Sequence, residues 1–480
     1  MLYSKLFGSE WLENNEDVDI TGIAYDSRSV TKGNVFVCIK GYESDGHKYA
    51  KMAEENGAAL IVAEDKVDVS IPVCYVENSR RTLAKLSCAF YNNPSKKFKL
   101  IGVTGTNGKT TITYLVKSIL EAAGKRVGVI GTNQNIIGDK VLVTKSNTPT
   151  TPNALELQQL FSEMVENDAE YVVMEVSSHA LDLDRVYGCK FDVGIFTNLT
   201  QDHLDFHKTM ENYLMAKAKL FDISEKGVVN YDDEGGRKIV QSKDCEFLKV
   251  GFGDGCDLVA SDMKIDAKGD DFNITYKGKT YPIHIGIPGK FSVYNAICAI
   301  GAALELGIDI ETIKNGLNEA KGVMGRVEVV PTDTDYTVII DYAHTPDGLE
   351  NIIRAVKEFA KGRVITLFGC GGDRDNTKRA IMGEIAGKLS DYSIITSDNP
   401  RTEDPVRIVE MVEEGMKKTD GKYTLIVDRR EAIGYALDFA KKDDVIILAG
   451  KGQETYQIIG KEKFDFDERV VVWNYLNKKI

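Results

Sequence analysis

Short apolar runs alternate with longer amphipathic segments along most of the chain. Strands that are buried on both faces of a parallel sheet read as nearly continuous apolar stretches. The pattern therefore predicts parallel strands at 100–103, 127–130, 171–176 and 193–199. A second series of such runs has helical patterns between its members and predicts a doubly wound sheet, with strands at 337–340, 364–368, 393–396, 424–427 and 445–448.

The arrangement of apolar runs and helical segments changes twice along the chain, and these changes predict three domains. Residues 1–97 carry short strand-like runs at 35–39 and 59–62 and form a small α/β module, ending in a breaker-rich stretch (92–97) typical of a linker. Residues 98–325 form the central domain and 326–480 the C-terminal, Rossmann-like domain. Within the central domain, the runs at 272–276 and 281–285 flank Lys277-Gly278-Lys279 and predict an antiparallel hairpin beside the parallel sheet. Helices are expected at 292–306 and 311–320.

Composition narrows the class of protein. A net charge of −13 and a pI near 5.2 argue against a nucleic-acid-binding or membrane-surface protein. No apolar run approaches the ~20 residues that cross a bilayer, and the first residues lack the pattern of a signal peptide. The eight cysteines are scattered without a CxxC pair, which indicates buried, reduced thiols. We therefore expect a cytoplasmic protein.

A glycine-rich loop follows the first central strand and opens a helix. It reads Gly105-Thr106-Asn107-Gly108-Lys109-Thr110-Thr111. Glycines let backbone N–H groups approach phosphates, and the helix N-terminus favours negative charge. Lys109 would reach the terminal phosphates of ATP and the Thr110 hydroxyl would bind Mg²⁺. The usual GxxxxGK[ST] pattern requires glycine at Val103, so a turn that merely caps a helix is the alternative.

Polar residues gather after the next strands. Glu175 ends an apolar run, and a carboxylate buried there needs a cation, which would be either Mg²⁺ or an arginine. Three of the six histidines (179, 203 and 207) fall in the same region, around the sequence Asp202-His203-Leu204-Asp205. This cluster favours a site at the carboxyl edge of the sheet, with His203 as a metal ligand in its neutral form.

Lys217 lies on the apolar stripe of a helix predicted at 211–222, whereas Lys219 points away from it. An inward lysine commonly extends to the surface or meets a carboxylate. Burial, however, lowers the pKa of a lysine and leaves the amine nucleophilic. Such an amine can take up CO₂ as a carbamate, which would suit a second Mg²⁺.

Taken together, strand-GTNGKTT, EVSSH, TNLxxDHLDxH and the inward Lys217 resemble the Mur ligases, over almost the whole chain. Within that family the chain is most similar to the branch that adds the third residue of the peptidoglycan stem peptide. The resemblance implies a monomeric ligase that uses ATP, two Mg²⁺ ions and a CO₂-derived carbamate on Lys217. Its expected partners are UDP-MurNAc-L-Ala-D-Glu and meso-diaminopimelate, with no nucleic acid and no membrane insertion.

The resemblance also assigns roles to residues. Lys109, His203 and Lys217 are the expected catalytic residues, and Thr110, Glu175, His203 and carbamylated Lys217 the metal ligands. The ATP site would combine the phosphate loop with Asn295, Arg326 and Asp341. The nucleotide-sugar peptide would contact Ser27, Tyr42, Glu43, Ser44, Thr150, Thr151, Ser177 and Arg185.

The expected amino-acid site lies in the third domain and consists of Arg374, Asp398, Asn399, Pro400, Arg401, Gly450 and Glu454. Arg401 would grip the distal carboxylate of diaminopimelate with two hydrogen bonds, and Glu454 would face the distal ammonium. Lysine lacks that carboxylate and would leave the arginine unpaired. The alternative for this segment is a turn with a surface arginine.

Four other functions fit part of the pattern. A lysine-adding synthetase would share every motif and would lack only the preference for diaminopimelate that Arg401 is expected to set. A folylpolyglutamate-synthase-like ligase would lack the first domain. An ATPase without ligase activity would have no reason to keep Asp398-Asn399-Pro400-Arg401, and a noncatalytic scaffold would not fill every catalytic position.

Overall fold

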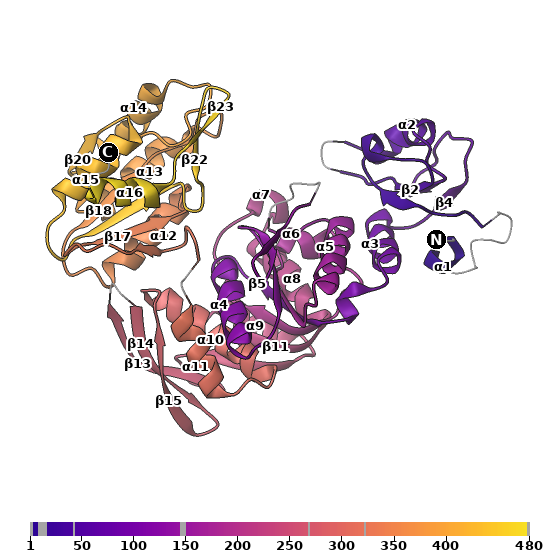
Figure 1. Cartoon of the computed structure of the whole chain (residues 1–480), viewed down its shortest axis with the longest axis horizontal. Helices are drawn as coiled ribbons and strands as arrows, with labels where there is room; N and C mark the ends of the chain where they lie inside the picture. Colours follow the sequence, from indigo (N-terminus) through magenta and orange to yellow (C-terminus); the bar gives the residue numbers. More distant parts are fainter. Residues whose placement is uncertain are drawn as a thin grey trace. The chain divides into compact units, whose positions relative to one another are not determined.

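The computed structural model describes residues 3–7, 17–41, 44–144, 150–266, 269–320 and 323–477. The chain forms two compact units. The first comprises residues 1–257 and 298–313, and the second comprises 258–297 and 314–480. The α/β class is confirmed throughout, whereas the three domain boundaries stay predictions (Figure 1).

The N-terminal part of the first unit is a four-stranded parallel sheet in the order β1-β2-β3-β4. Its strands are β1 (Gly22–Ala24), β2 (Asn34–Val37), β3 (Leu60–Ala63) and β4 (Val73–Tyr75). Its helices are α1 (Tyr3–Phe7), α2 (Ala50–Glu55) and α3 (Ser79–Phe90). β2 and β3 are buried at every position, so helices cover both faces and the two short runs are strands as predicted.

The predicted linker is wrong in one respect. Residues Pro94–Lys96 form the 3-10 helix η4, and Pro94 and Ser95 are buried. The turn packs against α5 (Ala154–Glu166). The breaker residues are therefore part of a packed corner, because a proline suits the first position of a helical turn as well as a linker.

The central sheet of this unit has the order β12-β11-β10-β5-β9-β6-β7-β8. The first six strands run parallel, and β7 and β8 are antiparallel additions. The strands are β5 (Lys99–Thr104), β6 (Val127–Ile130), β7 (Asn135–Ile137), β8 (Lys140–Leu142), β9 (Tyr171–Glu175), β10 (Phe191–Phe196), β11 (Ser224–Asn230) and β12 (Glu246–Gly251). The mixed pattern of β11 and the short β7 and β8 were not foreseen.

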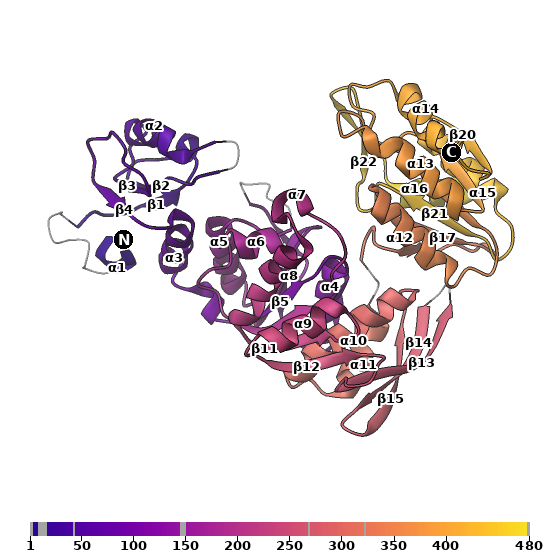
Figure 2. The same cartoon turned by 180° about the vertical axis from the view of Figure 1, so that it is seen from behind.

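Helices cover both faces of the central sheet. α4 (Lys109–Ala122) packs against β5, β6 and β9, and its place beside β5 can be followed in Figure 2. Its buried side chains include Ile112, Val116 and Ile119. The other helices are α5, α6 (Ser178–Asp182), α7 (Leu204–His207), α8 (Met210–Ala218) and α9 (Glu234–Ser242), with the 3-10 helix η5 (Lys219–Asp222) after α8. β5 is the second strand from β6 and lies between β9 and β10, so its end is the centre of the sheet's carboxyl edge.

The second unit contains an antiparallel group and a doubly wound sheet. The predicted hairpin is confirmed as β14 (Gly269–Tyr276) and β15 (Lys279–Ile285), and β13 (Leu258–Asp266) pairs with β14 as well. The two predicted helices are α10 (Lys290–Glu305) and α11 (Ile310–Glu319).

The doubly wound sheet has the order β16-β17-β21-β18-β19-β20 and is parallel except for β16. Its strands are β16 (Glu328–Val330), β17 (Thr337–Asp341), β18 (Val364–Phe368), β19 (Tyr392–Ile395), β20 (Tyr423–Leu425) and β21 (Val445–Ala449). Alternate residues face opposite cores: Ile446 packs with α15 (Arg429–Phe439) and α16 (Glu468–Leu476), and Ile447 with the helices of the other face. Those helices are α12 (Pro346–Lys357), α13 (Thr377–Leu389) and α14 (Pro405–Met416). A hairpin of β22 (Tyr456–Ile459) and β23 (Glu462–Asp465) follows β21.

All eight cysteines are free, six of them buried and two, Cys245 and Cys256, half-buried. None of the helices in the described ranges combines the length and the apolar character that a bilayer crossing needs.

Candidate active site

The phosphate loop turns at Gly105 rather than at Val103. Val103 lies inside β5, fully buried, and pairs with Glu175 on one side and Ile195 on the other. Gly105 has a φ of +146°, and a Cβ there would lie 1.9 Å from the Thr197 hydroxyl oxygen. The departure from the usual pattern is thus explained, because the loop is shorter and the residue that needs to be glycine comes two positions later.

The residues after β10 hold the loop in place. The Thr197 hydroxyl donates to the Asn107 carbonyl at 2.6 Å, and Asn198 accepts from the Asn107 and Thr106 amides at 2.9 Å. α4 then begins at Lys109, whose ammonium donates to the Gly105 and Thr106 carbonyls at 3.0 and 2.8 Å. The loop is therefore preorganised by its neighbours, with the lysine folded back over it.

Glu175 lies at the end of β9 with 1% of its surface exposed. Its carboxylate accepts from the Thr110 hydroxyl at 2.9 Å, the Thr132 amide at 2.8 Å and the Thr132 hydroxyl at 3.0 Å. Among the described residues, no lysine or arginine makes an ion pair with it, so the arginine alternative is not what the structure holds. A buried carboxylate beside a phosphate-loop threonine is a donor set that fits a divalent cation.

Lys217 is buried on α8, as its position on the apolar stripe predicted, whereas Lys219 is exposed and pairs with Asp182. The Lys217 ammonium nitrogen donates to the Gly105 carbonyl at 2.8 Å and lies 4.2 Å from the centre of the Tyr213 ring. Burial, and then the charge of Lys109, hold the pKa of Lys217 well below the ordinary lysine value. The side chain is therefore suited to be a neutral amine at the start of the phosphate loop.

The three histidines do come together. The His179 ring centre lies 4.8 Å from that of His203 and 5.4 Å from that of His207. His207 is buried and hydrogen-bonded to the Ser178 hydroxyl at 2.9 Å, which makes it structural. His203 is exposed, in a left-handed conformation (φ 52°), with its Nε2 3.5 Å from Asp202. Of the three, His203 has the access to solvent that a metal ligand beside ATP needs.

The expected muramoyl-peptide residues adjoin Glu175. The Thr151 hydroxyl donates to the Glu175 carbonyl at 2.9 Å and accepts from the Ser177 amide at 3.0 Å. Arg185 donates to the Thr151 carbonyl at 2.9 Å, and the Thr150 hydroxyl lies 3.1 Å from that of Thr132. These four residues thus continue the same carboxyl edge, beyond Glu175.

In the N-terminal sheet, Ser27 begins a 3-10 turn capped by Asp26 and is buried, with its hydroxyl 3.3 Å from the Met52 sulfur. The Ser44 hydroxyl, which is exposed, lies 3.2 Å from that of Tyr49. The other two residues expected here, Tyr42 and Glu43, lie outside the described residues.

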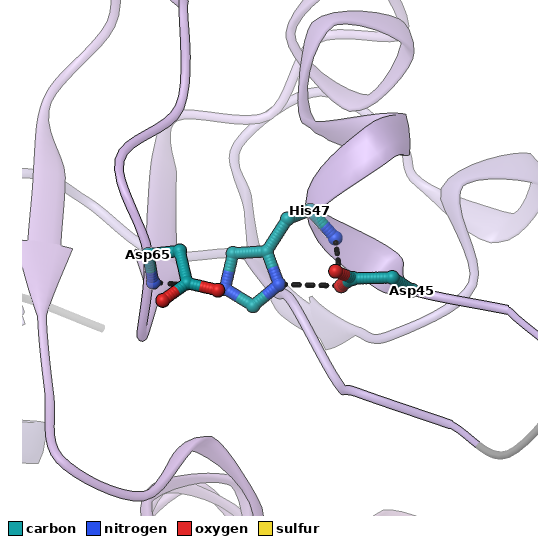
Figure 3. Close-up of side chains that lie close together, drawn as sticks. All are labelled: Asp45, His47 and Asp65. Atoms are coloured by element: carbon teal, nitrogen blue, oxygen red, sulfur yellow. Dashed lines mark hydrogen bonds and ion pairs between the residues drawn. The ribbon is translucent and has the colours of Figure 1, made fainter.

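Asp45, His47 and Asp65 also lie close together, in the arrangement of a possible metal site (Figure 3). The His47 Nδ1 lies 2.6 Å from Asp45, and its Nε2 accepts from the Glu64 and Asp65 amides at 3.0 and 3.2 Å. Both ring nitrogens are therefore used. His47 ties two loops together, and the cluster carries no metal argument.

The expected nucleotide residues of the second unit are mostly buried. Asp341 ends β17 and accepts from the Val327 amide at 2.9 Å and the Ala343 amide at 2.8 Å, and burial raises its pKa. The Arg326 guanidinium lies over the Tyr342 ring at 5.2 Å. Asn295 is buried on α10.

The expected amino-acid residues gather at the carboxyl ends of β18, β19 and β21. Arg401 is half-buried, with Nη1 donating to the Gly372 carbonyl at 2.8 Å, so it is not a surface arginine on a turn. Arg374 is exposed and donates to the Asp373 carbonyl at 3.1 Å. A Cβ built on Gly371 would lie 2.9 Å from Arg401 Nη1 and 3.9 Å from Arg374 Cγ, so both arginine side chains pass close to this glycine.

The rest of this group is more buried than expected. Asp398, Asn399 and Pro400 are buried, and the Asn399 amide donates to Glu454 at 2.9 Å. Gly450 has a φ of +120°, and a Cβ there would lie 2.9 Å from Asp398 Oδ2. The Asp398 side chain is thus buried next to the loop at Gly450, and its role in binding the amino acid stays a prediction.

Three family models match the chain in succession. They are described as the Mur ligase family catalytic domain (residues 19–91), the Mur ligase middle domain (103–303) and the Mur ligase glutamate ligase domain (325–452). A UDP-N-acetylmuramoyl-L-alanyl-D-glutamate--2,6-diaminopimelate ligase of Clostridium acetobutylicum is 50% identical over 467 residues, which are 96% of each chain. The chain belongs to the Mur ligase family.

Solved structures agree with this assignment. A structure of a UDP-N-acetylmuramoyl-L-alanyl-D-glutamate--2,6-diaminopimelate ligase matches with a TM-score of 0.76 and 30% identity, covering 100% of this chain and 99% of that one. A Thermotoga maritima MurF ligase in complex with ADP shares the fold, with a TM-score of 0.59, 22% identity and 95% and 97% coverage.

Sequence reasoning missed several residues that shape this Mur ligase site. Thr132 supplies two of the hydrogen bonds to Glu175, and Asn198 supports the phosphate loop from the next strand. Lys451 is fully buried beside the residues of the expected amino-acid site. Each occurs in a short polar segment after a strand, so the order of the parallel strands was the signal that could have found them.

Proposed function

We propose that this Mur ligase joins meso-diaminopimelate to UDP-MurNAc-L-Ala-D-Glu at the expense of ATP, in the synthesis of peptidoglycan precursors. The γ-carboxylate of D-Glu attacks the γ-phosphorus of ATP, forming an acyl phosphate and releasing ADP. The amine of diaminopimelate then adds to the acyl carbon. The tetrahedral intermediate collapses with loss of phosphate, and a proton leaves the new amide nitrogen.

The observation that carries this proposal is the placement of two buried groups on one phosphate loop. Lys217 donates to the first residue of the loop, Gly105, and Glu175 accepts from Thr110 near its end. A carboxylate beside the loop threonine is common to ATP sites that hold Mg²⁺. The buried lysine is the unusual group: as a carbamate it would hold a second Mg²⁺, and the two cations would offset the repulsion between the attacking carboxylate and the triphosphate.

Lys217 would act as a carbamate. The neutral amine forms a bond from its nitrogen to the carbon of CO₂ and loses one proton, which gives a carboxylate on the end of the side chain. The lowered pKa of Lys217 supports this step, since only the neutral amine reacts. The charge of the ammonium is replaced by a negative one, which is the sign that metal coordination requires.

Thr110 and Glu175 would hold one Mg²⁺ ion, and His203 with the carbamate of Lys217 would hold a second. Bound Mg²⁺ would neutralise the charge that develops on the phosphate oxygens. Lys109, folded over the loop at 3.0 Å from the Gly105 carbonyl, would turn its ammonium toward the same phosphates. Arg326, Asp341 and Asn295 would complete the ATP site, and Ser27, Tyr42, Glu43 and Ser44 the UDP site.

The amine is selected in the second unit. Arg401 and Arg374 both pass close to Gly371 and would receive the distal carboxylate of diaminopimelate, with Glu454 facing the distal ammonium. The named function of the Clostridium acetobutylicum relative supports this choice over lysine. We infer that the protein acts in the cytoplasm, where ATP and nucleotide-linked precursors are available, and that it is a monomer.

The direct test is phosphate release with ATP and UDP-MurNAc-L-Ala-D-Glu while the amino acid is varied. We expect release with meso-diaminopimelate and little with L-lysine. Equal release without any amino acid would identify an ATPase instead. Preference for lysine would leave the ligase chemistry intact and reject the assigned amine, and release with glutamate and a folate would favour the folylpolyglutamate alternative.

A further inference from the structure

Lys451 is a fully buried lysine that the reaction described above does not use. It lies between Gly450 and Gly452, directly after β21, with none of its surface exposed. An ammonium group in such a place is costly unless it is fully paired. Its partners therefore indicate what it does.

Those partners are residues of the expected amino-acid site. The Lys451 Nζ donates to the Asn399 side-chain oxygen at 3.2 Å and to the Tyr456 carbonyl at 2.7 Å. It also lies 3.4 Å from Asp398 Oδ1 and 3.7 Å from Glu454 Oε2. The contact with Asp398 is an ion pair without hydrogen-bond geometry, and Asp398 Oδ1 is buried. One cation thus serves two carboxylates.

The contact with Asn399 decides which way its amide faces. The Asn399 oxygen accepts from Lys451 and also from the Ile458 amide at 2.9 Å. With its oxygen taken by two donors, the amide must direct its NH₂ toward the Glu454 carboxylate, which accepts at 2.9 Å. The position of Glu454 is in this way fixed by Lys451 twice, once directly and once through Asn399.

A second buried cation, Arg429, binds the chain near the ends of β19 and β21. Arg429 and Glu468 form an ion pair at 2.8 Å with neither side chain exposed. Arg429 also donates to the Ala449 carbonyl at 2.9 Å and to the Ser397 carbonyl at 3.4 Å. These carbonyls immediately precede Gly450 and Asp398, so the loops that carry Lys451 and Asn399 start from a fixed base.

We propose that Lys451 is a positioning residue for the choice of amino acid, holding Glu454 and Asn399 where the distal ammonium of the substrate is recognised. This inference rests on the proposed function. Lys451 does not touch the substrate, because it is fully enclosed. Its single positive charge is shared between the buried Asp398 and the half-buried Glu454, so the two carboxylates keep a net negative charge for the incoming ammonium.

The inference predicts an effect confined to one substrate. In the full-length chain, Lys451→Met is expected to raise the KM for diaminopimelate by about tenfold or more, since a buried polar network loses its central donor. The KM values for ATP and for UDP-MurNAc-L-Ala-D-Glu should stay within about twofold of the wild-type values. The conservative variant Lys451→Arg should recover part of the loss. Lys461→Met, at the exposed turn between β22 and β23, is the matched control and should behave as wild type.

A double-variant comparison separates positioning from general damage. If Lys451 acts through Glu454, then Lys451→Met should add little to the KM for diaminopimelate in a Glu454→Gln background. That background also removes one carboxylate and so restores the charge balance of the buried network, which keeps the test valid if the single variant folds poorly. Additive effects in the two backgrounds would overturn the proposal.

Two further outcomes are decisive. An unchanged KM for diaminopimelate in Lys451→Met would show that the lysine only fills space, and an equal rise in all three KM values would show a general structural role. Either result overturns the inference while wild-type protein still requires diaminopimelate for phosphate release. Failure of the wild type to show that requirement would instead reject the proposed function itself.

Discussion

Lys217 and Lys109 donate hydrogen bonds to the same acceptor, the carbonyl oxygen of Gly105, at 2.8 and 3.0 Å. Two ammonium groups on one oxygen repel each other, and Lys217 is the one that is almost completely buried. The arrangement therefore favours loss of the Lys217 proton. In the proposed reaction the loop would be shared between Lys109, which serves the nucleotide, and the Lys217 amine, which would take up CO₂.

The first prediction concerns this amine. Lys217→Ala should lower the rate of phosphate release by about 100-fold or more, because a ligand for the second metal is lost. Added bicarbonate should not restore it. Lys219→Ala, which removes an exposed lysine of the same segment, is the control and should retain normal turnover. Near-normal activity of Lys217→Ala would reject the carbamate.

The second prediction is a pH dependence. Because burial and Lys109 lower the Lys217 pKa, the amine is neutral at a lower pH than an ordinary lysine. Activation by bicarbonate should persist below the ordinary lysine pKa and disappear as acidification through the lowered pKa of Lys217 protonates the amine. Isotope-labelled bicarbonate should give a carbamate signal by NMR in wild type and none in Lys217→Ala. A midpoint near the ordinary lysine pKa would contradict the structure.

The third prediction concerns amine selection. Arg401→Ala should lower the ratio of kcat/KM for diaminopimelate to that for lysine by about tenfold or more, since the distal carboxylate loses a charged partner. Arg401→Lys should recover little, because an ammonium cannot make the paired contact. Arg407→Ala removes an exposed arginine on α14 and serves as the control. An unchanged ratio in Arg401→Ala would show that selection lies elsewhere.

The fourth prediction compares two glycines with positive φ. Gly105→Ala places a Cβ 1.9 Å from the Thr197 hydroxyl, so the loop must shift and the KM for ATP should rise sharply. Gly124 has a φ of +72° but nothing within 4 Å of the added Cβ. Gly124→Ala should therefore cost about 1 kcal/mol of stability without changing the KM for ATP. Equal effects on the KM for ATP would mean that the contact with Thr197 is unimportant.

The fifth prediction concerns stability. Asp270 is fully buried on β14, and burial raises its pKa to about 7, although Gly289 donates to it and His284 is nearby. Between the usual aspartate pKa of 3.8 and the raised pKa of about 7, the folded state holds a proton that the unfolded state has lost, so stability falls as the pH rises.

Asp270→Asn keeps the shape without the charge and should raise the melting temperature at pH 8 more than at pH 5. Thermal unfolding at the two pH values measures the difference. Asp271→Asn, the exposed neighbour that pairs with His284, is the control and should lack this pH dependence. A stabilisation of Asp270→Asn that is the same at both pH values would contradict the raised pKa.

Much of the fold followed from local pattern. Apolar runs marked the central strands because parallel strands buried on both faces leave no polar positions, and α8 could be oriented from its stripe, which placed Lys217 inside. β11 escaped because Ser224, Glu225 and Lys226 occupy the first part of the strand, where the sheet is only half-buried. An apolar run in the sequence therefore predicts a strand only where that strand is buried in the fold.

The site was predictable where one residue type has one plausible role. The phosphate loop and the inward lysine satisfy this condition. The hydrogen-bond partners of these residues could not be predicted, because hydrogen bonds such as that from Lys217 to Gly105 join residues 112 positions apart in the chain. Lys451 shows the same limit: between two glycines it resembles a turn residue, and only its contacts with Asp398 and with Asn399, 52 positions away in the chain, show that it belongs to a buried polar network.

Arg401 is held by the backbone of the hairpin that follows β21. Its amide donates to the Ile458 carbonyl at 3.1 Å, its carbonyl accepts from the Gly460 amide at 2.7 Å, and its φ is 51°. Backbone hydrogen bonds therefore join residues 398–401 to the hairpin of β22 and β23. A variant meant to accept another diamino acid should therefore have both segments exchanged together. A side chain replaced alone at position 401 would stay on a backbone with the left-handed conformation that Arg401 has.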